Sequence, residues 1–548
     1  MSTYKARTKN ALRNRISNAK LLSTSALTAI SLVALSSNAA MAVDVDPNKD
    51  WDSATIVAGD ADVIDAGLGL THINQHTMRA VGEIGDASIG ANAVVTIFQN
   101  GTGDLFVMRD TAGNDPTQIL GTLRTRLKGS NSVGGSTMVL DTNGVIFGAN
   151  SVVDMTSIAV STGQLSNADI MDGNGNFEFS NFGDGAIELN GTINVAEAGL
   201  AAFVSPTVIN NGVINAKMGT VVFAAGETVT LDLYGDGLVE LAVEGELADA
   251  LLENKGTIDA AGGTVQMSAV AAKGAVDNII NVEGVVTVAS ATQSGGKIIL
   301  SGGNAGAVSV KGKLDASGAT EGGDINVTGE TIEVAGGAVI ENNGDSSNTY
   351  LFGNKQTNFH GSLAAGTNAQ AEISGKNLNI DGASVLLGDG SQISFDPDDF
   401  IVNAANVGTF TGLMGGGNVT VDIEAKNTIR LDTDIDTTGQ TTTSTLNFKD
   451  EDANNDLQVN LYGSINLAAT QNLTGDATQV NVANGALIQN AVDIASVANG
   501  ATIDVADGIF AENVIINKDN IILNGEQAGV DGYLRTGINE TFLQGRIN

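Results

Sequence analysis

The feature that most constrains the fold of this chain is a glycine that recurs just before a short apolar, strand-forming segment. From about residue 186 onward the pattern returns as NGTINV, NGVINA, KGTIDA, EGVVTV, KGKLDA and GGAVIE. The recurring glycines are Gly191, Gly212, Gly256, Gly284, Gly312 and Gly337, with spacings of 21, 44, 28, 28 and 25 residues, and 44 equals two units of 22. A period of about 20 to 30 residues built from short strands and glycine turns indicates a solenoid, in which each rung buries its apolar face on the next.

The lengths of the expected strands select the type of solenoid. They are about four to five residues long and lie at Thr220–Ala224, Thr264–Met267, Lys297–Leu300 and Asp324–Val327. Strands of this length without a fixed leucine frame favour a parallel β-helix over a leucine-rich repeat. Aromatic residues make up only 4% of the chain, as expected for a narrow interior filled by Val, Ile, Leu and Ala. We therefore predict an all-β, right-handed parallel β-helix with capping strands, because parallel crossovers are overwhelmingly right-handed.

Two segments depart from the repeating pattern. Leu238–Leu252 has helical periodicity and predicts a minor amphipathic helix on the flank of the solenoid. Thr437–Asp456 is Thr-rich and then acidic, and we interpret it as an interruption of the rungs and the best domain boundary.

The N-terminus has the form of a secretory signal peptide. Six basic residues and no acidic residue precede the apolar run LLSTSALTAISLVAL, and the small-residue sequence Ala40-Met41-Ala42 follows. We predict a signal peptide at residues 1–42 with cleavage after Ala42. The alternative is an uncleaved anchor, but the apolar run is short and interrupted by Ser and Thr. No later segment approaches the ~18 apolar residues of a membrane helix, so we expect an exported, soluble chain.

The charge of the chain indicates which partners it can bind, and its cysteine content bears on how it is exported. Removal of the signal peptide leaves 20 basic residues (26 minus 6) against 62 acidic ones, a net charge of −42. Such an acidic surface repels nucleic acid and anionic headgroups, so we predict no nucleic-acid partner. The chain has no cysteine. Either it must remain extendable for threading through a pore in an oxidising compartment, or a large β-repeat protein needs no disulfide.

The segment from about Gly69 to Gly163 carries several ordered phrases. It reads INQHTMRAVGEIGDASIGANAVVTIFQ from Ile73 to Gln99, then DPTQILGTL, and then DTNGVIFGANSVVDMTSIAVST from Asp141. This segment resembles the secretion domain of filamentous-haemagglutinin-like proteins, the exoproteins of two-partner secretion. The positions that match the motifs of that family include Gln75, Arg79, Ala80, Gln99, Asn143, Gly144, Phe147 and Gly148. Similar phrases continue the resemblance through the stem to about Val334.

This sequence departs from the family pattern at the turn before Asn143. Asp141 and Thr142 stand where the family has Asn-Pro, and the Trp often found after the Arg-Ala-Val phrase is absent. The loss of a proline-stiffened turn leaves Asn143-Gly144 to set the backbone conformation.

The resemblance implies a mechanism, partners and a location. Secretion domains of this family are recognised by an outer-membrane β-barrel transporter with periplasmic domains, and the chain folds outside as a β-helical shaft. We therefore expect an adhesin or surface display protein, secreted or at the cell surface of a Gram-negative bacterium after passage through the periplasm. Its adhesion ligand would be a host glycan or a cell-surface receptor. A motif that acts by strand pairing with a receptor needs no reactive side chain, and these motifs contain no residues that look catalytic.

Other candidate chemistry is weak. His72 and His76 are four residues apart but have no third ligand nearby, so we interpret them as surface residues. The cluster from Asp172 to Asn176 lacks the Gly and Glu of a calcium loop and predicts a plain turn. Asp396, Asp398 and Asp399 predict a solvated acidic loop. We predict no catalytic residue, no cofactor, no metal and no enzymatic activity.

The C-terminal segment Ala486–Gly525 supports an alternative function, that of a carbohydrate-active β-helix. It resembles the opening rungs of pectate-lyase-like β-helices: Ile488, Gln489, Ala491 and Val492 fit a capping helix, and Gly508, Phe510, Glu512 and Val514 fit the first rung. The alternative function is thus a carbohydrate-active polysaccharide lyase or hydrolase on the same export module.

The predicted organisation has five parts. They are the signal peptide (1–42), the secretion domain (43–185), the β-helical stem (186–435), a Thr-rich and acidic linker (436–480) and the start of a second, truncated β-helical module (481–548).

Overall fold

In the first half of the solenoid each turn of the chain adds three short strands that pair in parallel with those of the preceding turn, whereas Asp324–Val334 is one long strand that pairs with two of them. In one turn the three short strands are β14 (Ala186–Leu189), β15 (Thr192–Val195) and β16 (Leu200–Val204). In the next turn, β17 (Thr207–Asn210), β18 (Val213–Asn215) and β19 (Thr220–Ala225) pair with them in that order. The predicted all-β fold, a parallel β-helix, is confirmed.

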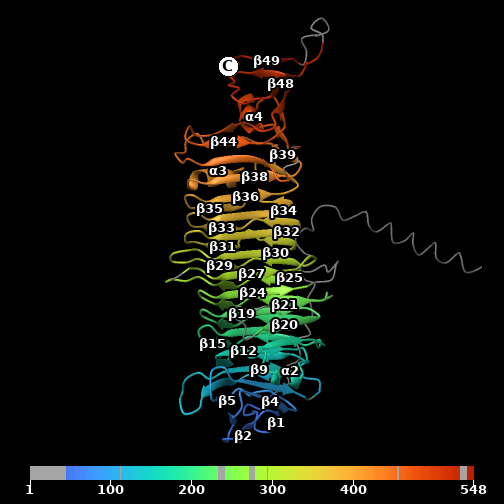
Figure 1. Ribbon diagram of the computed structural model, residues 1–548, viewed down its shortest axis with the longest axis vertical. Helices are drawn as coiled ribbons and strands as arrows, with labels where there is room; N and C mark the ends of the chain where they lie inside the picture. Colours follow the sequence, from blue (N-terminus) through green and yellow to red (C-terminus); the bar gives the residue numbers. More distant parts are fainter. Residues whose placement is uncertain are drawn as a thin grey trace, which may run out of the picture. The chain divides into compact units, whose positions relative to one another are not determined.

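A computed structural model describes residues 45–548 except 112, 233–240, 248, 271–277, 293, 453–455 and 531–539. The predicted signal peptide and its cleavage site at Ala42 lie outside the described residues. Val45–Asn548 form one unit, in which the rungs follow one another from β1 and β2 to β48 and β49 (Figure 1). Among the described residues, no helix has the length and apolar character needed to cross a bilayer.

The strands that precede the rung of β14 are β1 (Thr55–Ala58), β2 (Ala61–Asp65), β3 (Leu70–Gln75), β4 (Arg79–Ile84), β5 (Val94–Gln99), β6 (Leu105–Asp110), β7 (Thr117–Ile119), β8 (Thr122–Leu127), β9 (Ser136–Leu140), β10 (Val145–Phe147), β11 (Val152–Met155), β12 (Ser157–Ser161) and β13 (Asn176–Phe179). The middle strands are β20 (Thr228–Asp232), β21 (Leu241–Glu244), β22 (Leu251–Asn254), β23 (Thr257–Asp259), β24 (Thr264–Ala269), β25 (Asn278–Val282), β26 (Val285–Thr287), β27 (Lys297–Ser301), β28 (Ala307–Val310), β29 (Lys313–Asp315), β30 (Asp324–Val334), β31 (Val339–Asn342), β32 (Asn348–Phe359), β33 (Ser362–Ala365), β34 (Gln370–Asn379), β35 (Ser384–Leu387) and β36 (Gln392–Asp396).

The last strands are β37 (Asp399–Val402), β38 (Thr420–Ala425), β39 (Thr428–Leu431), β40 (Ile435–Asp436), β41 (Thr445–Asp450), β42 (Gln458–Leu461), β43 (Ile465–Asn466), β44 (Asn472–Gly475), β45 (Gln479–Val482), β46 (Ala501–Val505), β47 (Gly508–Phe510), β48 (Ile521–Gly525) and β49 (Thr541–Leu543). The helices among the described residues are α2 (Asn167–Met171), α3 (Val407–Gly416) and α4 (Ile488–Ile494).

The interior is filled by every second residue of the strands. In β15, for example, Ile193 and Val195 are buried while Thr192 and Asn194 are partly exposed. Like side chains stack on one another from rung to rung, as where the rings of Phe203 and Phe223 meet edge to face at 5.6 Å. Alternation therefore gives every rung one apolar inner face and one outer face that can carry other chemistry.

The recurring glycines form a column at one corner of the solenoid, where successive backbones come very close. A Cβ added to Gly212 would lie 2.2 Å from the carbonyl oxygen of Gly191, and one on Gly256 would lie 2.1 Å from that of Gly212. The same contact is repeated from Gly284 to Gly256 at 2.0 Å and from Gly312 to Gly284 at 1.9 Å. No side chain fits at such distances, so these four positions require glycine.

The predicted sixth member of the column is wrong by one residue. Val339 of β31 pairs with Lys313 of β29, so Ala338 rather than Gly337 occupies the position next to Gly312. A Cβ on Gly337 would meet no atom within 4 Å. The segment GGAVIE contains two consecutive glycines, so the glycines alone leave the register of this rung open. Ile340 is buried, and its inward position sets the register.

The predicted flanking helix at Leu238–Leu252 is also wrong. Within its described part the chain forms strand β21 and enters strand β22, which is a rung strand paired with β17. β21 pairs antiparallel with β20 outside the solenoid. The apolar residues of this segment also fit the alternation of two short strands. Pairing of these strands with β20 and β17 outweighs the local preference for a helix.

The predicted interruption of the rungs at Thr437–Asp456 is wrong as well. β41 lies in this interval and pairs in parallel with β38 before it and β44 after it. The second sheet continues in the same way through β42, β45 and β46. Pairing is therefore continuous from the predicted stem into residues 481–548.

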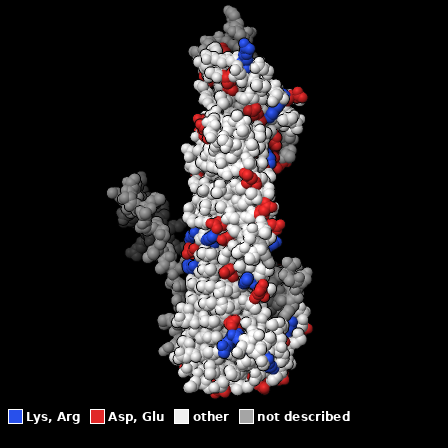
Figure 2. Space-filling view, turned by 90° about the vertical axis from the view of Figure 1, so that its left-hand side faces the viewer, with Lys and Arg blue, Asp and Glu red and all other residues white. Residues whose placement is uncertain are grey.

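Charged side chains on the outer surface are arranged locally rather than in one field. On the face shown in Figure 2, acidic and basic side chains are interspersed and uncharged residues cover most of the surface. Several pairs bridge successive rungs, such as Lys311 with Glu283 at 2.9 Å and Lys313 with Glu341 at 2.8 Å. Exposed pairs of this kind each contribute little to stability.

The glycine column generates a prediction. Gly256→Ala places a Cβ against the backbone of the adjacent rung, so we expect the free energy of unfolding to fall by about 1–3 kcal/mol, as for other overpacked sites. Gly337→Ala is the matched control, because its Cβ would point into open space, and it should change stability by less than about 0.5 kcal/mol. Urea denaturation followed by circular dichroism measures both; equal effects of the two variants would contradict the register described here.

Candidate functional site

The segment that carries the secretion motifs begins at an antiparallel cap. β1 pairs antiparallel with β4, and β2 with β3, whereas β3 and β4 pair in parallel with β5 and β6 of the next rung. The indole of Trp51, fully buried beside this cap, donates a hydrogen bond to the carbonyl oxygen of Ala87 at 2.7 Å. The cap thus closes the first rung, as the predicted capping strands require.

Gln75 and Gln99, two of the predicted motif residues, form a buried amide pair. Both side chains are fully buried, and Nε2 of Gln99 donates to Oε1 of Gln75 at 3.0 Å. Nε2 of Gln75 donates in turn to the carbonyl oxygens of Thr77 at 2.8 Å and Leu105 at 3.0 Å. The pair satisfies backbone acceptors at the corner between β3 and β4, so these residues shape the first rungs from inside.

Arg79 and Ala80 are neighbours on β4 but face opposite sides of the sheet. Ala80 is fully buried in the solenoid core. Arg79 points outward, where its guanidinium donates to the carbonyl oxygen of Ile170 in α2 at 2.6 Å and lies 5.6 Å from the ring centre of Phe177. Arg79 therefore holds a segment that is 91 residues later in the chain against the first complete rung.

That segment belongs to a small sheet outside the solenoid, which the sequence analysis missed. β13, β20 and β21 pair antiparallel in this sheet. Phe177, Phe179 and Leu231 form a second core with residues on the outer face of the rungs, among them Val107 and Met138. A sequence signal was available: β6 begins with the apolar run LFVM, β9 ends with MVL and β16 is LAAFV throughout, and such runs are typical of strands buried on both faces.

The turn DTNG is organised by Asp141 rather than by Asn143-Gly144 alone. The buried carboxylate of Asp141 accepts hydrogen bonds from the backbone N–H of Thr117 at 2.8 Å, from its hydroxyl at 2.9 Å and from the backbone N–H of Asn143 at 2.8 Å. The last of these is an Asx turn. Burial raises the pKa of Asp141, and these hydrogen bonds oppose that rise. Asp141 replaces the turn-stiffening role that proline has in the family pattern.

The other predicted residues of this motif have steric roles. Gly144 has φ +112°, and a Cβ there would lie 2.6 Å from the carbonyl oxygen of Ala186. Phe147 is fully buried in the core on β10, which pairs with β7 and β14. A Cβ on Gly148 would meet the side chain of Leu120 at 2.8 Å.

The motif residues thus lie in separate structural groups. Gln75 and Gln99 bond to each other, Arg79 bonds to α2, and the Asp141 turn bonds to Thr117. Their arrangement can hold the shape of the first rungs, and it offers no assembled catalytic geometry. Their role in recognition by a transporter remains a prediction.

The histidines occupy surface positions in the structure. The ring of His72 meets that of Phe98 edge to face at 5.2 Å, and Nε2 of His76 lies 3.0 Å from Asp62. At the predicted turn, Asp172 accepts a hydrogen bond from the backbone of Asn174 at 3.0 Å, with Gly173 at φ +87°. Within the described ranges, the carboxylates close enough to share a cation are those of Asp450, Asp452 and Asp456.

The prediction that Asp396 lies in a solvated acidic loop is wrong. Asp396 ends strand β36 and is partly buried, with Oδ1 enclosed and without a hydrogen-bond partner, rather than lying in a solvated loop. Asp399 is exposed on β37 and accepts a hydrogen bond from Thr428 at 2.6 Å.

The fold and the capped N-terminal rungs define a class: a parallel β-helix whose first rungs are closed by antiparallel strands and clasped from outside by a second small sheet. Residues 88–316 match the family model of the TPS secretion domain, the domain of two-partner secretion. This part of the chain is therefore similar to the secretion domain of two-partner secretion exoproteins. The match extends past the predicted limit at residue 185, and pairing is continuous there as well, since β14 pairs with both β10 and β17.

Two solved structures are similar. The secretion domain of HMW1 from Haemophilus influenzae is 18% identical, with 78% of this chain and 98% of that chain covered and a TM-score of 0.49. The filamentous hemagglutinin secretion domain is 14% identical, with 61% of this chain and 99% of that chain covered and a TM-score of 0.30. No curated protein matches the sequence.

The Asp141 turn gives a prediction for stability. Asp141→Ala removes the acceptor of the N–H of Asn143 and one of the two acceptors of both the N–H and the hydroxyl of Thr117, which keep the carbonyl oxygen of Gly144 and the carboxylate of Asp110. The free energy of unfolding should therefore fall by about 1–3 kcal/mol, the cost of lost buried hydrogen bonds. Asp172→Ala removes the acceptor of an exposed Asx turn and should cost less than about 1 kcal/mol. Urea denaturation compares the two; equal losses would contradict the role assigned to Asp141.

The raised pKa of Asp141 predicts that the stability of the fold depends on pH. Because burial raises its pKa in the folded chain above the ordinary value of 3.8, the folded state binds the proton of Asp141 more tightly than the unfolded state does. Its contribution to stability is therefore largest below pH 3.8 and is lost as the pH rises through the folded-state pKa. We expect the stability of the wild type, relative to Asp141→Asn, to decline over this range in denaturation experiments. A relative stability that rises with pH would show that the pKa is lowered instead.

Proposed function

We propose that this exoprotein is recognised in the periplasm by a partner transporter, threaded through its β-barrel and folded outside into a shaft that acts as an adhesin or display protein. The observation that carries the proposal is the match of residues 88–316 to the TPS secretion domain, which implies an outer-membrane transporter partner. The periplasmic domains of the transporter would make the first contact with the chain.

The N-terminal cap offers a surface for that contact. β2 is the terminal strand of its sheet and pairs only with β3 among the described strands. Apolar side chains are exposed beside this edge: Ile64 is 42% exposed, Leu68 is 90% exposed and Met78 is 71% exposed. A strand edge with apolar neighbours can accept a strand from a receptor through backbone hydrogen bonds.

The architecture suits folding outside the cell without an energy source. Every rung after the cap finds its hydrogen-bond partners on the rung before it, so one folded rung provides the template for the next. The chain has no cysteine, and no disulfide can therefore lock it before threading. The outer faces of the rungs would then be displayed to a host glycan or a cell-surface receptor.

A carbohydrate-active β-helix is the second candidate, and the C-terminal rungs favour it. Helix α4 forms where the pectate-lyase-like pattern predicts it, and β47 follows. The carboxylate of Glu512 accepts hydrogen bonds from the backbone N–H groups of Ile488 at 2.7 Å and Gln489 at 3.0 Å, which caps α4 from the next rung. Cleavage of acidic polysaccharides, with and without calcium, tests this candidate.

Export is tested by deletion in cells that also produce the partner transporter. Deleting residues 70–163 removes the motif-bearing rungs, so we expect the protein to disappear from the medium and the cell surface. The matched control deletes residues 324–347, a complete turn, because Asp324 of β30 pairs with Asn348 of β32 and the new junction keeps the register. The control should still be exported, and export of the first variant would overturn the proposal.

A further inference from the structure

The outer face of the large sheet carries aligned side chains from β32 to β41 that neither the secretion motifs nor the rung stacking explains. One column runs through Tyr350, Glu372, Ser394, Asp422 and Asn447. The adjacent column pairs Phe352 with Ser374 and Ser374 with Asp396, and on the following strands it pairs Glu424 with Lys449. Because strands lie about 4.8 Å apart, each column presents one side chain per rung at a regular interval.

These columns border a groove. It has a volume of about 380 Å³ and is lined by Tyr350, Gln370, Glu372, Ser394, Asp396 and Glu424, among others. The volume lies in the range of small-molecule sites. The groove crosses several rungs, so an elongated ligand along the solenoid axis would meet equivalent positions in turn.

An aromatic surface lies at the β32 end. The rings of Tyr350 and Phe352 are nearly parallel, at 17°, with their centres 6.0 Å apart. Both side chains are partly exposed on the outer face. Flat aromatic surfaces that are open to solvent can stack on the apolar face of a sugar ring while the hydroxyls remain hydrated.

The middle of the groove carries negative charge. Within the part of the chain that the structure describes, no ion pair joins Glu372 or Asp396 to a base. Burial, followed by the charges of Glu451, Glu424, Glu372 and Asp398, raises the pKa of Asp396 to about 7. Oδ1 of Asp396 and the hydroxyl of Ser394 are enclosed without hydrogen-bond partners. A cationic ligand would relieve this repulsion and satisfy the carboxylates.

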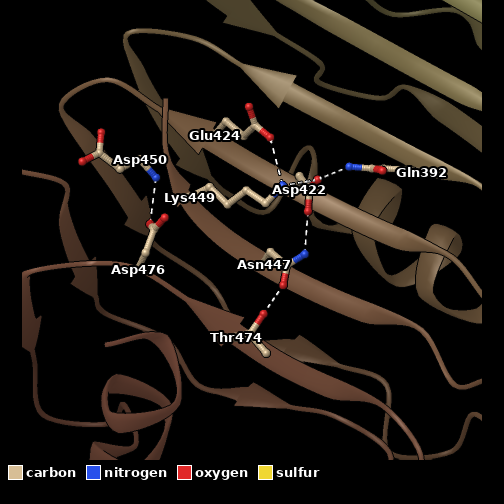
Figure 3. A network of polar contacts seen from close by, with 8 residues as sticks. All are labelled: Gln392, Asp422, Glu424, Asn447, Lys449, Asp450, Thr474 and Asp476. Carbon is tan, nitrogen blue, oxygen red and sulfur yellow. Dashed lines mark hydrogen bonds and ion pairs between the residues drawn. The ribbon is translucent and has the colours of Figure 1, made fainter. Parts of the chain in front are cut away.

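The other end is held by a network of polar contacts (Figure 3). Asp422 is fully buried and accepts hydrogen bonds from Gln392, Asn447 and Lys449, each at 2.6 Å. Lys449 also reaches Glu424 at 3.2 Å, and Asn447 accepts a hydrogen bond from Thr474. Lys449 thus neutralises charge at this end, and the excess of negative charge remains between Tyr350 and Glu424.

We propose that this groove binds a polysaccharide whose sugars carry protonated amino groups, with Tyr350 stacked on one sugar ring and Glu372 and Asp396 receiving the ammonium groups of its neighbours. A hexopyranose unit has nearly the length of one rung spacing, so successive sugars match successive strands. Uronic-acid and sulfated chains are repelled by the same carboxylates. The inference rests on the proposed adhesin role, and it names the class of ligand.

The test measures binding of a β-1,4-linked glucosamine hexamer to the purified full chain by calorimetry at neutral pH. We expect binding that weakens at least about tenfold in Tyr350→Ala and in the double variant Glu372→Gln with Asp396→Asn, as loss of one good contact implies. The N-acetylated hexamer and an oligogalacturonate should bind at least tenfold more weakly than the glucosamine hexamer. Tyr462→Ala is the matched control, since Tyr462 is an exposed tyrosine outside the groove, and it should bind like the wild type.

Other outcomes would overturn the proposal. Equal binding of spermine, or binding that is unaffected by Tyr350→Ala, would mean that the groove attracts cations without recognising a sugar. Equal binding of the acetylated hexamer would assign the groove to neutral glycans. Circular dichroism of each variant excludes misfolding as the cause of lost binding. The calorimetry uses purified protein and the export experiment uses cells, so the two results are independent. Loss of sugar binding would overturn only the proposed ligand, and loss of export would not affect the binding measurement.

Discussion

The structure depends on the close stacking of one backbone turn on the next at the glycine corners. At Gly212, Gly256, Gly284 and Gly312 the carbonyl of the preceding rung occupies the space that a side chain would need. This approach fixes the register of all strands that follow the corner, because a one-residue slip would turn the inner face of a rung outward. Once the register is fixed, the outer face is free to vary, so one solenoid carries both an antiparallel cap and a groove lined by carboxylates.

The period of the glycines sufficed to predict the parallel β-helix, because each repeat imposes the same local geometry on every rung. It did not suffice at Gly337, where two adjacent glycines left the frame open until Ile340 showed which residues point inward. The segment at Leu238–Leu252 and the acidic stretch near Asp450 failed for a related reason. Their local composition suggests helix and linker, and only pairing with strands distant in the sequence makes them parts of sheets.

The candidate site was less predictable than the fold. Motif resemblance located Gln75, Arg79 and Gly144, but their partners lie in other rungs and were not visible from sequence. Asp141 was noted as a departure from the family pattern, and its role depends on the proximity of Thr117, 24 residues earlier. Asp396 was predicted to be solvated because its neighbours in sequence are acidic. Burial raises its pKa, and the charges of Glu372 on β34, Glu424 on β38 and Glu451 just after β41 raise it further.

The clasp made by Arg79 on α2 has a consequence for the timing of assembly. The outer surfaces of Val107 and Met138 are covered by Phe177, Phe179 and Leu231, which come much later in the chain. Until that later stretch is in place, the earliest rungs expose apolar surface and are incompletely stabilised. The first rungs therefore become stable only when the chain is folded as far as Leu231, so the N-terminal segment and the small outer sheet form one cooperative unit.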